Sequence, residues 1–194
     1  MSAKKQLWIL TGGNGTGKST FYRLFLEPLG IKLINADIIA KEINPEQQEM
    51  AAYQAATLAE KLREDLISQG TSFCFETVFS HPSKIDFIAR AKSLGYEIIL
   101  VFIHLDSIEL NVARVSQRVS EGGHSVPTHK IISRIPRILK NITKTLLLAD
   151  EARLLDNSFA DDPYQQVAVI KQGTCKTLMK PLPSWAKIIL KSYI

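Results

Sequence analysis

Gly12–Ser19 has the glycine, lysine and serine spacing of a phosphate-binding loop. Its sequence, GGNGTGKS, matches G-x-x-x-x-G-K-[ST] at every fixed position, which an ordinary glycine-rich turn would not require. Glycines let successive backbone N–H groups face inward and form an anion site at a helix start. The loop lysine reaches the β- and γ-phosphates of ATP, and the next hydroxyl coordinates Mg²⁺. We therefore predict a nucleotide site consisting of Gly12, Gly13, Asn14, Gly15, Thr16, Gly17, Lys18, Ser19 and Thr20, with Ser19 as the metal ligand.

Acidic residues follow two other predicted strands. Asp37 comes after the apolar segment 31–34, and Glu76 and Thr77 come directly after the segment 72–75, at the end of that strand. Because ligands gather at the carboxyl edge of open α/β sheets, we expect both carboxylates beside the phosphate loop. Asp37 could accept the proton of a hydroxyl that attacks the γ-phosphate, or could cap the segment that follows. Glu76 needs a partner, which could be a Mg²⁺-bound water, a substrate hydroxyl or an arginine in a structural salt bridge.

Four arginines lie in pairs on two predicted helices. Arg114 and Arg118 are four residues apart, and Arg134 and Arg137 are three apart, so each pair shares a helix face. The glycine-containing segment 121–127 separates the two helices. Such an arrangement is typical of a small kinase lid, where guanidinium groups neutralise charge on the transferring phosphoryl group. We expect Arg118 and Arg134 to contact phosphate, whereas Arg114 and Arg137 could do so or belong to a solvated polar face.

Two further polar segments carry weaker signals. Asp156–Ser158 closes a predicted strand, so its polar groups could lie near the nucleotide base or simply form a turn. His124 lies between the two arginine-bearing helices, and we expect it to be a loop residue rather than a catalyst.

The elements that position these residues alternate between apolar strands and amphipathic helices. Strands are predicted at 6–11, 31–34, 72–75, 96–105, 152–155 and 165–170. Helices are predicted at 18–29, 46–69, 82–94, 108–119, 131–146 and 185–191, and Pro136 must kink the fifth of these or mark its true start. The alternation predicts a mainly parallel sheet covered on both faces, a three-layer α/β/α sandwich of the P-loop NTPase, nucleotide-kinase-like class. We expect one domain over 1–194, with a helical lid at about 115–140.

Composition narrows the class of protein further. The 194 residues are 45% hydrophobic and 22% charged, which is ordinary for a globular domain with one core. No apolar run approaches the ~20 residues that cross a bilayer, and the apolar stretch near the N-terminus is too short for a secretory signal. Cys74 and Cys175 lie far apart, which argues against a disulfide framework or zinc cluster and favours the cytoplasm.

The net charge of +5 fits either a nucleic-acid binder or an enzyme for phosphorylated substrates. Nucleic-acid end phosphorylation would need a basic track with interleaved aromatic residues, and the sequence has no such stretch. We therefore do not expect nucleic acid as a partner.

The sequence resembles the zeta toxin family of small P-loop kinases from about Leu7 to Ser158. The resemblance is carried by GGNGTGKST, INAD, FCFET, GYEIILVFIHL, RVSQRVSEGGHSVP, SRIPRI and LLDNS. It implies a nucleotide-kinase-like fold with a parallel five-stranded central sheet. The family's toxins use ATP and Mg²⁺ to phosphorylate a sugar hydroxyl of UDP-N-acetylglucosamine, and a paired antitoxin restrains them.

The resemblance also implies roles for individual residues. Lys18 would hold phosphate and Ser19 the metal, while Asp37 would activate the acceptor hydroxyl. The remaining matches are Glu76 and Thr77, which would contact the substrate, and Arg118 and Arg134, which would contact the γ-phosphate. The chain departs from the family at Ile135, where many relatives have tyrosine, and at Val78, where a second threonine is common. It also lacks the segments with which larger toxins grip the uridine sugar, which leaves the acceptor open.

We therefore expect an ATP- and Mg²⁺-dependent kinase that acts on a hydroxyl of a small molecule, with ATP hydrolysis as a side reaction. A UDP-sugar is one candidate acceptor, and an antitoxin protein is one candidate partner. The alternative is an ATP-binding and hydrolysing regulatory module that has no small-molecule acceptor.

Overall fold

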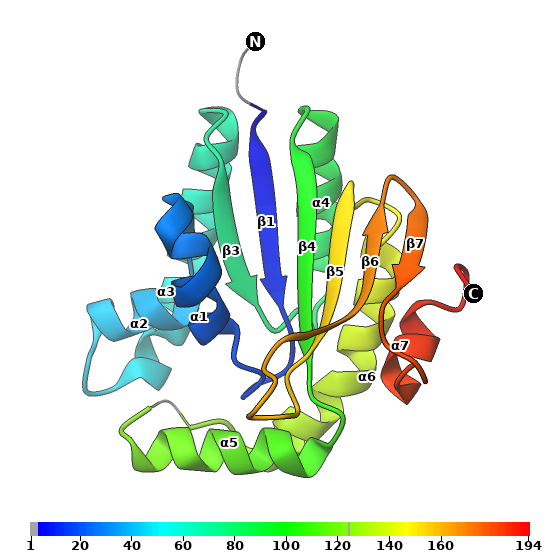
Figure 1. The fold of residues 1–194 in the computed structure, drawn as a ribbon. Coiled ribbons are helices and arrows are strands. Elements are labelled where there is room, and N and C mark those ends of the chain that lie inside the picture. The colour runs from blue at the N-terminus through cyan, green and yellow to red at the C-terminus, as the bar shows by residue number, and fades with distance from the viewer. Residues whose placement is uncertain (1–3, 124) are drawn as a thin grey trace.

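Seven strands form one sheet in the computed structural model, which describes residues 4–123 and 125–194. The strand order is β2-β3-β1-β4-β5-β6-β7. The first five strands in this order are parallel, and β6 and β7 extend the sheet as an antiparallel hairpin (Figure 1). The strands are β1 (Gln6–Thr11), β2 (Lys32–Ile34), β3 (Phe73–Thr77), β4 (Glu97–His104), β5 (Glu151–Asp156), β6 (Gln165–Lys171) and β7 (Thr174–Thr177).

Helices pack on both faces of the sheet, because successive strand residues point to opposite sides. On β1, Leu7 and Ile9 are buried in one core, and Trp8 and Leu10 are buried in the other. The first core is covered by α2, α3, α4, α6 and α7, and the second by α1 and the turns after it. The α-helices are α1 (Lys18–Phe21), α2 (Ala36–Ile43), α3 (Gln48–Ser68), α4 (Ser83–Ser93), α5 (Ile108–Ser120), α6 (Thr128–Thr145) and α7 (Ser184–Ile189). The predicted three layers are confirmed.

Two predicted helices differ from the observed ones. The helix predicted at 18–29 divides into α1, a π-helical turn (Tyr22–Leu26) and a 3-10 turn (Glu27–Leu29) that contains Pro28. The helix predicted at 46–69 corresponds to α3, but α2 precedes it and was not predicted. Its N-cap is Asn35, whose Oδ1 accepts hydrogen bonds from the backbone N–H groups of Asp37 and Ile38.

The strand β7 and the position of Pro136 also differ from expectation. β7 has four residues and pairs with β6 across the turn Gln172–Gly173, where both residues have positive φ. Pro136 lies inside the continuous helix α6, so it does not mark the helix start. Because proline has no N–H group, it cannot donate the helical hydrogen bond to the carbonyl of Ile132.

The two helices predicted to form a lid lie at the carboxyl end of the sheet. Figure 1 shows α5 crossing below the ends of β1 and β3, with α6 rising behind the sheet. His124, predicted as a loop residue between them, lies outside the described residues. Within the ranges that the structure describes, none of the helices is both long and apolar enough for a bilayer crossing.

His104, the last residue of β4, is buried at the edge of the larger core. Its ring centre lies 4.9 Å from that of Trp185 and 5.5 Å from that of Phe102. Burial lowers the pKa of His104 to about 4, although Asp156, its partner on β5, acts in the opposite direction. The imidazole is therefore neutral in the folded protein at pH 7.

We expect acidification from pH 7 to pH 5 to destabilise the wild type by about 2 kcal/mol more than a His104→Phe variant. The unfolded chain takes up a proton at this histidine below pH 6.5, whereas the folded protein does so only near pH 4. Stability is therefore lost as the pH falls through this window. Urea unfolding at both pH values measures the difference, and an identical pH dependence in the two proteins would contradict this account.

Candidate active site

The phosphate loop connects β1 to α1 and is closely packed from two sides. Gly15 and Gly17 have φ of 79° and 91°, a left-handed conformation that glycine adopts without strain. A Cβ atom on Gly12 would lie 2.1 Å from the carbonyl oxygen of Ile103, and one on Gly17 would lie 2.6 Å from Nδ2 of Asn157. The loop therefore needs glycine both for its turns and for its contacts with β4 and the segment after β5.

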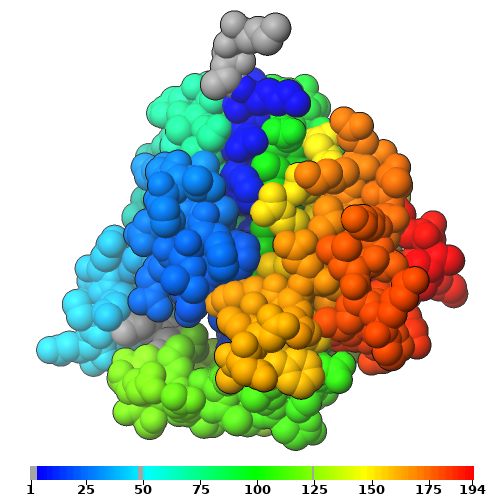
Figure 2. Space-filling model, viewed as in Figure 1, coloured from blue at the N-terminus to red at the C-terminus, as the bar shows by residue number. Residues whose placement is uncertain are grey.

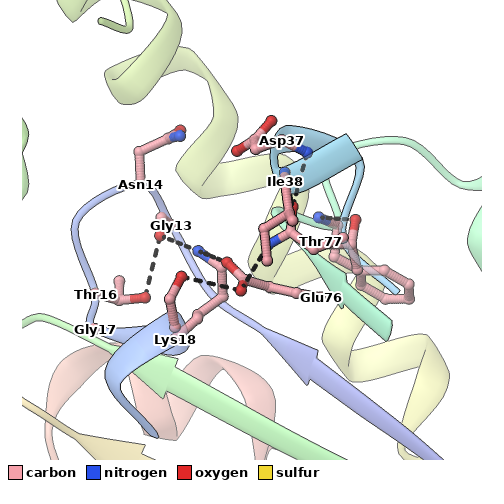
Figure 3. Close-up of polar contacts among 12 residues, drawn as sticks. Gly13, Asn14, Thr16, Gly17, Lys18, Asp37, Ile38, Glu76 and Thr77 are labelled. Atoms are coloured by element: carbon pink, nitrogen blue, oxygen red, sulfur yellow. Dashed lines mark hydrogen bonds and ion pairs between the residues drawn. The ribbon is translucent and has the colours of Figure 1, made fainter. Parts of the chain in front are cut away.

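Lys18 is the first residue of α1, and its side chain is only 7% exposed. Its Nζ donates to the carbonyl of Gly13 over 2.9 Å and lies 3.8 Å from Oε1 of Glu76 (Figure 3). Burial lowers the pKa of Lys18, while the Glu76 and Asp37 carboxylates raise it. The lysine thus lies across the loop with little solvent, where a phosphate group would supply the missing negative charge.

Glu76 joins the phosphate loop to the adjacent strand–helix turn. Its Oε2 accepts one hydrogen bond from the Ser19 hydroxyl over 3.1 Å and another from Nδ2 of Asn35 over 2.9 Å (Figure 3). β3 runs two residues further than predicted, so Glu76 and Thr77 end the strand beside Leu10 and Thr11. Because β1 and β3 are adjacent and parallel, Glu76 and the loop leave the sheet at the same edge.

The donor set around Ser19 suits Mg²⁺. Within the described residues, no group of three or more His, Cys, Asp and Glu side chains could hold a metal by itself. Mg²⁺ does not need such a group, because it commonly takes one or two protein oxygens and completes its octahedron with phosphates and water. The Ser19 hydroxyl is exposed and lies 3.1 Å from a Glu76 carboxylate oxygen. These two residues are the ones that would hold the metal.

Asp37 lies in the first turn of α2 and is exposed. The predicted alternative, that Asp37 caps the segment after it, is wrong because the cap is Asn35. Figure 3 shows Asp37 and Asn14 on the same side of Lys18 and Glu76. The Asp37 carboxylate is thus available to a ligand on that side.

The predicted lid arginines are divided between two surfaces. Arg114 and Arg118 on α5 line a cavity together with Lys18. Arg134 on α6 donates from Nη1 to Oδ1 of Asn14 over 3.1 Å, which brings this helix onto the phosphate loop. Arg137 is exposed and hydrogen-bonds to Ser133 of its own helix, as expected for a solvated polar face.

A first cavity, of about 440 Å³, lies over the phosphate loop. Figure 2 shows the three segments around it meeting on one face of the molecule: α1 in blue, α5 in green and the segment after β5 in yellow-orange. The cavity combines cationic and apolar walls. Its lining residues are Gly15, Gly17, Lys18, Ser19, Thr20, Leu24, Glu76, Arg114, Arg118, Asn157, Phe159, Ala160, Pro163 and Tyr164.

A second cavity, of about 590 Å³, adjoins the loop at Asn14 and shares no lining residue with the first. Asn14 and Thr77 line it, together with Asp37 and Arg134. Its wall includes the turn after β3, where Phe79 has a φ of 63° that is uncommon for an aromatic residue. The remaining lining residues are Ala52, Val78, Phe79, Ser80, His81, Lys84, Ser125, Val126, Pro127 and Lys130.

Three residues that support the loop were not identified as such from the sequence. Asn111 on α5 is buried, and its Nδ2 donates to the carbonyl of Asn14 over 2.7 Å. Tyr164 donates from its hydroxyl to the carbonyl of Gly17, and Asn157 donates to that of Thr16. Asn157 belongs to the weakly predicted segment 156–158. One sequence feature could have identified Asn111: it is a polar residue on the buried face of an amphipathic helix.

Comparisons with known proteins agree with this architecture. A family model described as an AAA domain matches residues 7–162. An uncharacterized protein of Haemophilus influenzae is 34% identical over 130 residues, which are 63% of this chain and 92% of that protein.

Solved structures show the same fold at low sequence identity. A chain of the AvrRxo1-ORF1:AvrRxo1-ORF2 complex with sulphate ions has a TM-score of 0.74 and 20% identity, covering 97% of this chain and 64% of that one. A chain of the same complex with ATP has a TM-score of 0.72 and 19% identity, covering 98% of this chain and 64% of that one. A chain of the PezAT toxin–antitoxin system of Streptococcus pneumoniae has a TM-score of 0.68 and 16% identity, covering 98% of this chain and 78% of that one. This chain thus spans just under two thirds of the AvrRxo1 chain, and it has the predicted P-loop NTPase fold.

We expect an Asn111→Ala variant to bind nucleoside triphosphate about tenfold more weakly, because the carbonyl of Asn14 loses its partner and the loop loses a contact with α5. Titration calorimetry with ATP and Mg²⁺ measures the change. Ser116→Ala, at an exposed position of the same helix, is the matched control. Unchanged affinity in Asn111→Ala would show that this contact does not order the loop.

Proposed function

The chain belongs to the AAA domain family, and we propose that it is an ATP- and Mg²⁺-dependent phosphotransferase that acts on a hydroxyl of a small molecule. One observation carries the proposal: two cavities that share no lining residue adjoin the same phosphate loop. Lys18 and Glu76 line the first cavity, and Asn14 and Thr77 line the second. A phosphoryl group held by the loop would therefore be accessible from both.

ATP would occupy the first cavity, whose lining combines cationic and apolar residues. The N–H groups of the loop, Lys18 and Arg118 would contact the phosphates, and the apolar wall with Phe159 and Pro163 would face the base. Ser19 and Glu76 would hold Mg²⁺, which when bound neutralises charge on the phosphate oxygens. Arg118 on α5 and Arg134 on α6 would stabilise charge on the transferring group from two helices.

The acceptor would occupy the second cavity. Asp37 would align its hydroxyl and take its proton as the hydroxyl attacks, and Thr77 would contact it. The lid helices would exclude water, which otherwise competes as the acceptor and leads to ATP hydrolysis.

Two structural relatives support ATP as the nucleotide and a protein antitoxin as a partner. The AvrRxo1 complex was solved with ATP, and PezAT is a toxin–antitoxin system. We include a zeta-toxin-like acceptor such as a UDP-sugar and a protein antitoxin as partner. The two free thiols, Cys74 and Cys175, support a reducing cytoplasm as the site of action.

The test is incubation with γ-labelled ATP, Mg²⁺ and a metabolite pool that includes UDP-N-acetylglucosamine, followed by identification of the labelled product. We expect one labelled phosphate monoester. Release of labelled inorganic phosphate alone would instead support a regulatory module that hydrolyses ATP without an acceptor.

We expect Asp37→Asn to reduce phosphoryl transfer by about a hundredfold or more while nucleotide binding stays nearly intact, because the variant cannot accept the hydroxyl proton. Initial rates of label transfer and calorimetric titration with ATP measure the two effects. Glu42→Gln, an exposed carboxylate of the same helix, is the matched control. If transfer by Asp37→Asn equals that of the wild type, Asp37 is not the base.

A further inference from the structure

Segment 157–164, which connects β5 to β6, packs against the phosphate loop through two side chains. Nδ2 of Asn157 donates to the carbonyl of Thr16 over 3.0 Å. The Tyr164 hydroxyl donates to the carbonyl of Gly17 over 2.9 Å. A Cβ atom on Gly17 would lie 2.6 Å from Nδ2 of Asn157 and 3.0 Å from the Tyr164 hydroxyl oxygen. One segment thus holds two successive carbonyls of the loop at close range.

Asn157, which directly follows β5, is buried and fixed by further hydrogen bonds. Its backbone N–H donates to the carbonyl of His104 at the end of β4 over 2.9 Å. Its Oδ1 accepts a hydrogen bond from the backbone N–H of Tyr164 over 3.3 Å. The oxygen and the nitrogen of an asparagine amide belong to one planar group, so the bond at Oδ1 also orients Nδ2. The residue therefore joins β4, the phosphate loop and the segment before β6.

Tyr164 has a φ of 60°, a left-handed conformation that is uncommon for residues other than glycine. Such a conformation persists where the surrounding contacts determine it. One of these contacts is the hydrogen bond to Asn157. The others are edge-on aromatic contacts, in which the Tyr164 ring centre lies 5.3 Å from that of Phe21 and 5.9 Å from that of Phe25. Together they place the Tyr164 hydroxyl on the carbonyl of Gly17.

A carbonyl that is held in place also orients the N–H group of the next residue. The peptide unit is planar and trans, so the C=O of one residue and the N–H of the next point in opposite directions. Because segment 157–164 holds the carbonyls of Thr16 and Gly17, the N–H groups of Gly17 and Lys18 point away from that segment. These two belong to the N–H groups with which a phosphate loop forms its anion site.

We propose that Asn157 and Tyr164 are positioning residues, which hold the phosphate loop in the shape that binds a polyphosphate by aiming two of its N–H groups at the ligand. This inference rests on the proposed function, and it assigns to segment 157–164 a role at the phosphates. The competing role is contact with the base, because both residues also line the first cavity. The two roles predict different responses to a ligand that has phosphates but no base.

The probes are ATP and tripolyphosphate, each titrated calorimetrically with Mg²⁺ into the protein. Tripolyphosphate has three phosphates and no base, so its affinity depends on the phosphate loop alone. We expect Tyr164→Phe to weaken the binding of both probes by the same factor, about threefold, and Asn157→Ala to weaken both by about tenfold. The effect of Tyr164→Phe is smaller because the carbonyl of Gly17 keeps a second partner, the backbone N–H of Phe21.

The matched controls lose the same kind of hydrogen bond elsewhere in the chain. The Tyr22 hydroxyl donates to the carbonyl of Ile31 over 2.8 Å. Nδ2 of Asn141, which is buried, donates to the carbonyl of Phe79 over 2.9 Å. Neither Tyr22 nor Asn141 lines the first cavity. We therefore expect Tyr22→Phe and Asn141→Ala to bind both probes as the wild type does.

Thermal melting followed by circular dichroism verifies that each variant folds. Tyr164→Phe keeps the aromatic ring, so it remains the test if Asn157→Ala does not fold.

The outcomes separate this inference from the function on which it rests. Weaker binding of ATP with unchanged binding of tripolyphosphate would make the two residues base contacts and overturn the inference. Unchanged binding of both probes would also overturn it. So would a wild type that binds ATP but not tripolyphosphate, because the loop would then not supply the affinity. Failure of the wild type to bind either probe overturns the proposed function instead.

Discussion

A buried ammonium group organises the carboxyl end of this sheet. Lys18 is held by one backbone carbonyl and faces one carboxylate, that of Glu76, at 3.8 Å. Burial without full compensation costs free energy, and a phosphate anion is the group that would offset it most effectively. Glu76 in turn is fixed by Ser19 and Asn35, so the cation, the hydroxyl and the α2 turn form one hydrogen-bonded unit.

Asn14 connects that unit to α5 and α6. Its backbone carbonyl accepts a hydrogen bond from Asn111 on α5, and its side chain accepts one from Arg134 on α6. Both helices are therefore attached to the same residue of the phosphate loop, which also lines the second cavity. A ligand that moves the loop would move both helices, which is how the arrangement could link nucleotide binding to closure over an acceptor.

Much of the fold and of the candidate site could be predicted from the sequence, because local sequence patterns determine those parts. Short-range sequence patterns identify the phosphate loop, the apolar strands and the acidic residues that follow them. Because the strands are parallel, their carboxyl ends lie at one edge of the sheet, which brings these residues together. The contacts of Asn111 and Tyr164 could not be predicted, because partners 97 and 147 residues away decide them. α2 was missed because Asp37 was considered as the capping residue of this segment, whereas the residue that caps the helix is Asn35. β7 was missed because it is an edge strand of only four residues of mixed polarity, which carry little periodicity.

The most direct measurement is titration calorimetry of ATP with Mg²⁺ into the wild type and a Lys18→Met variant. The account predicts one saturable site in the wild type and at least about hundredfold weaker binding in the variant, because the cation that faces the phosphates is gone. Absence of binding to the wild type, or equal affinity in the two proteins, would contradict the claim that this buried lysine and its loop form a nucleotide site.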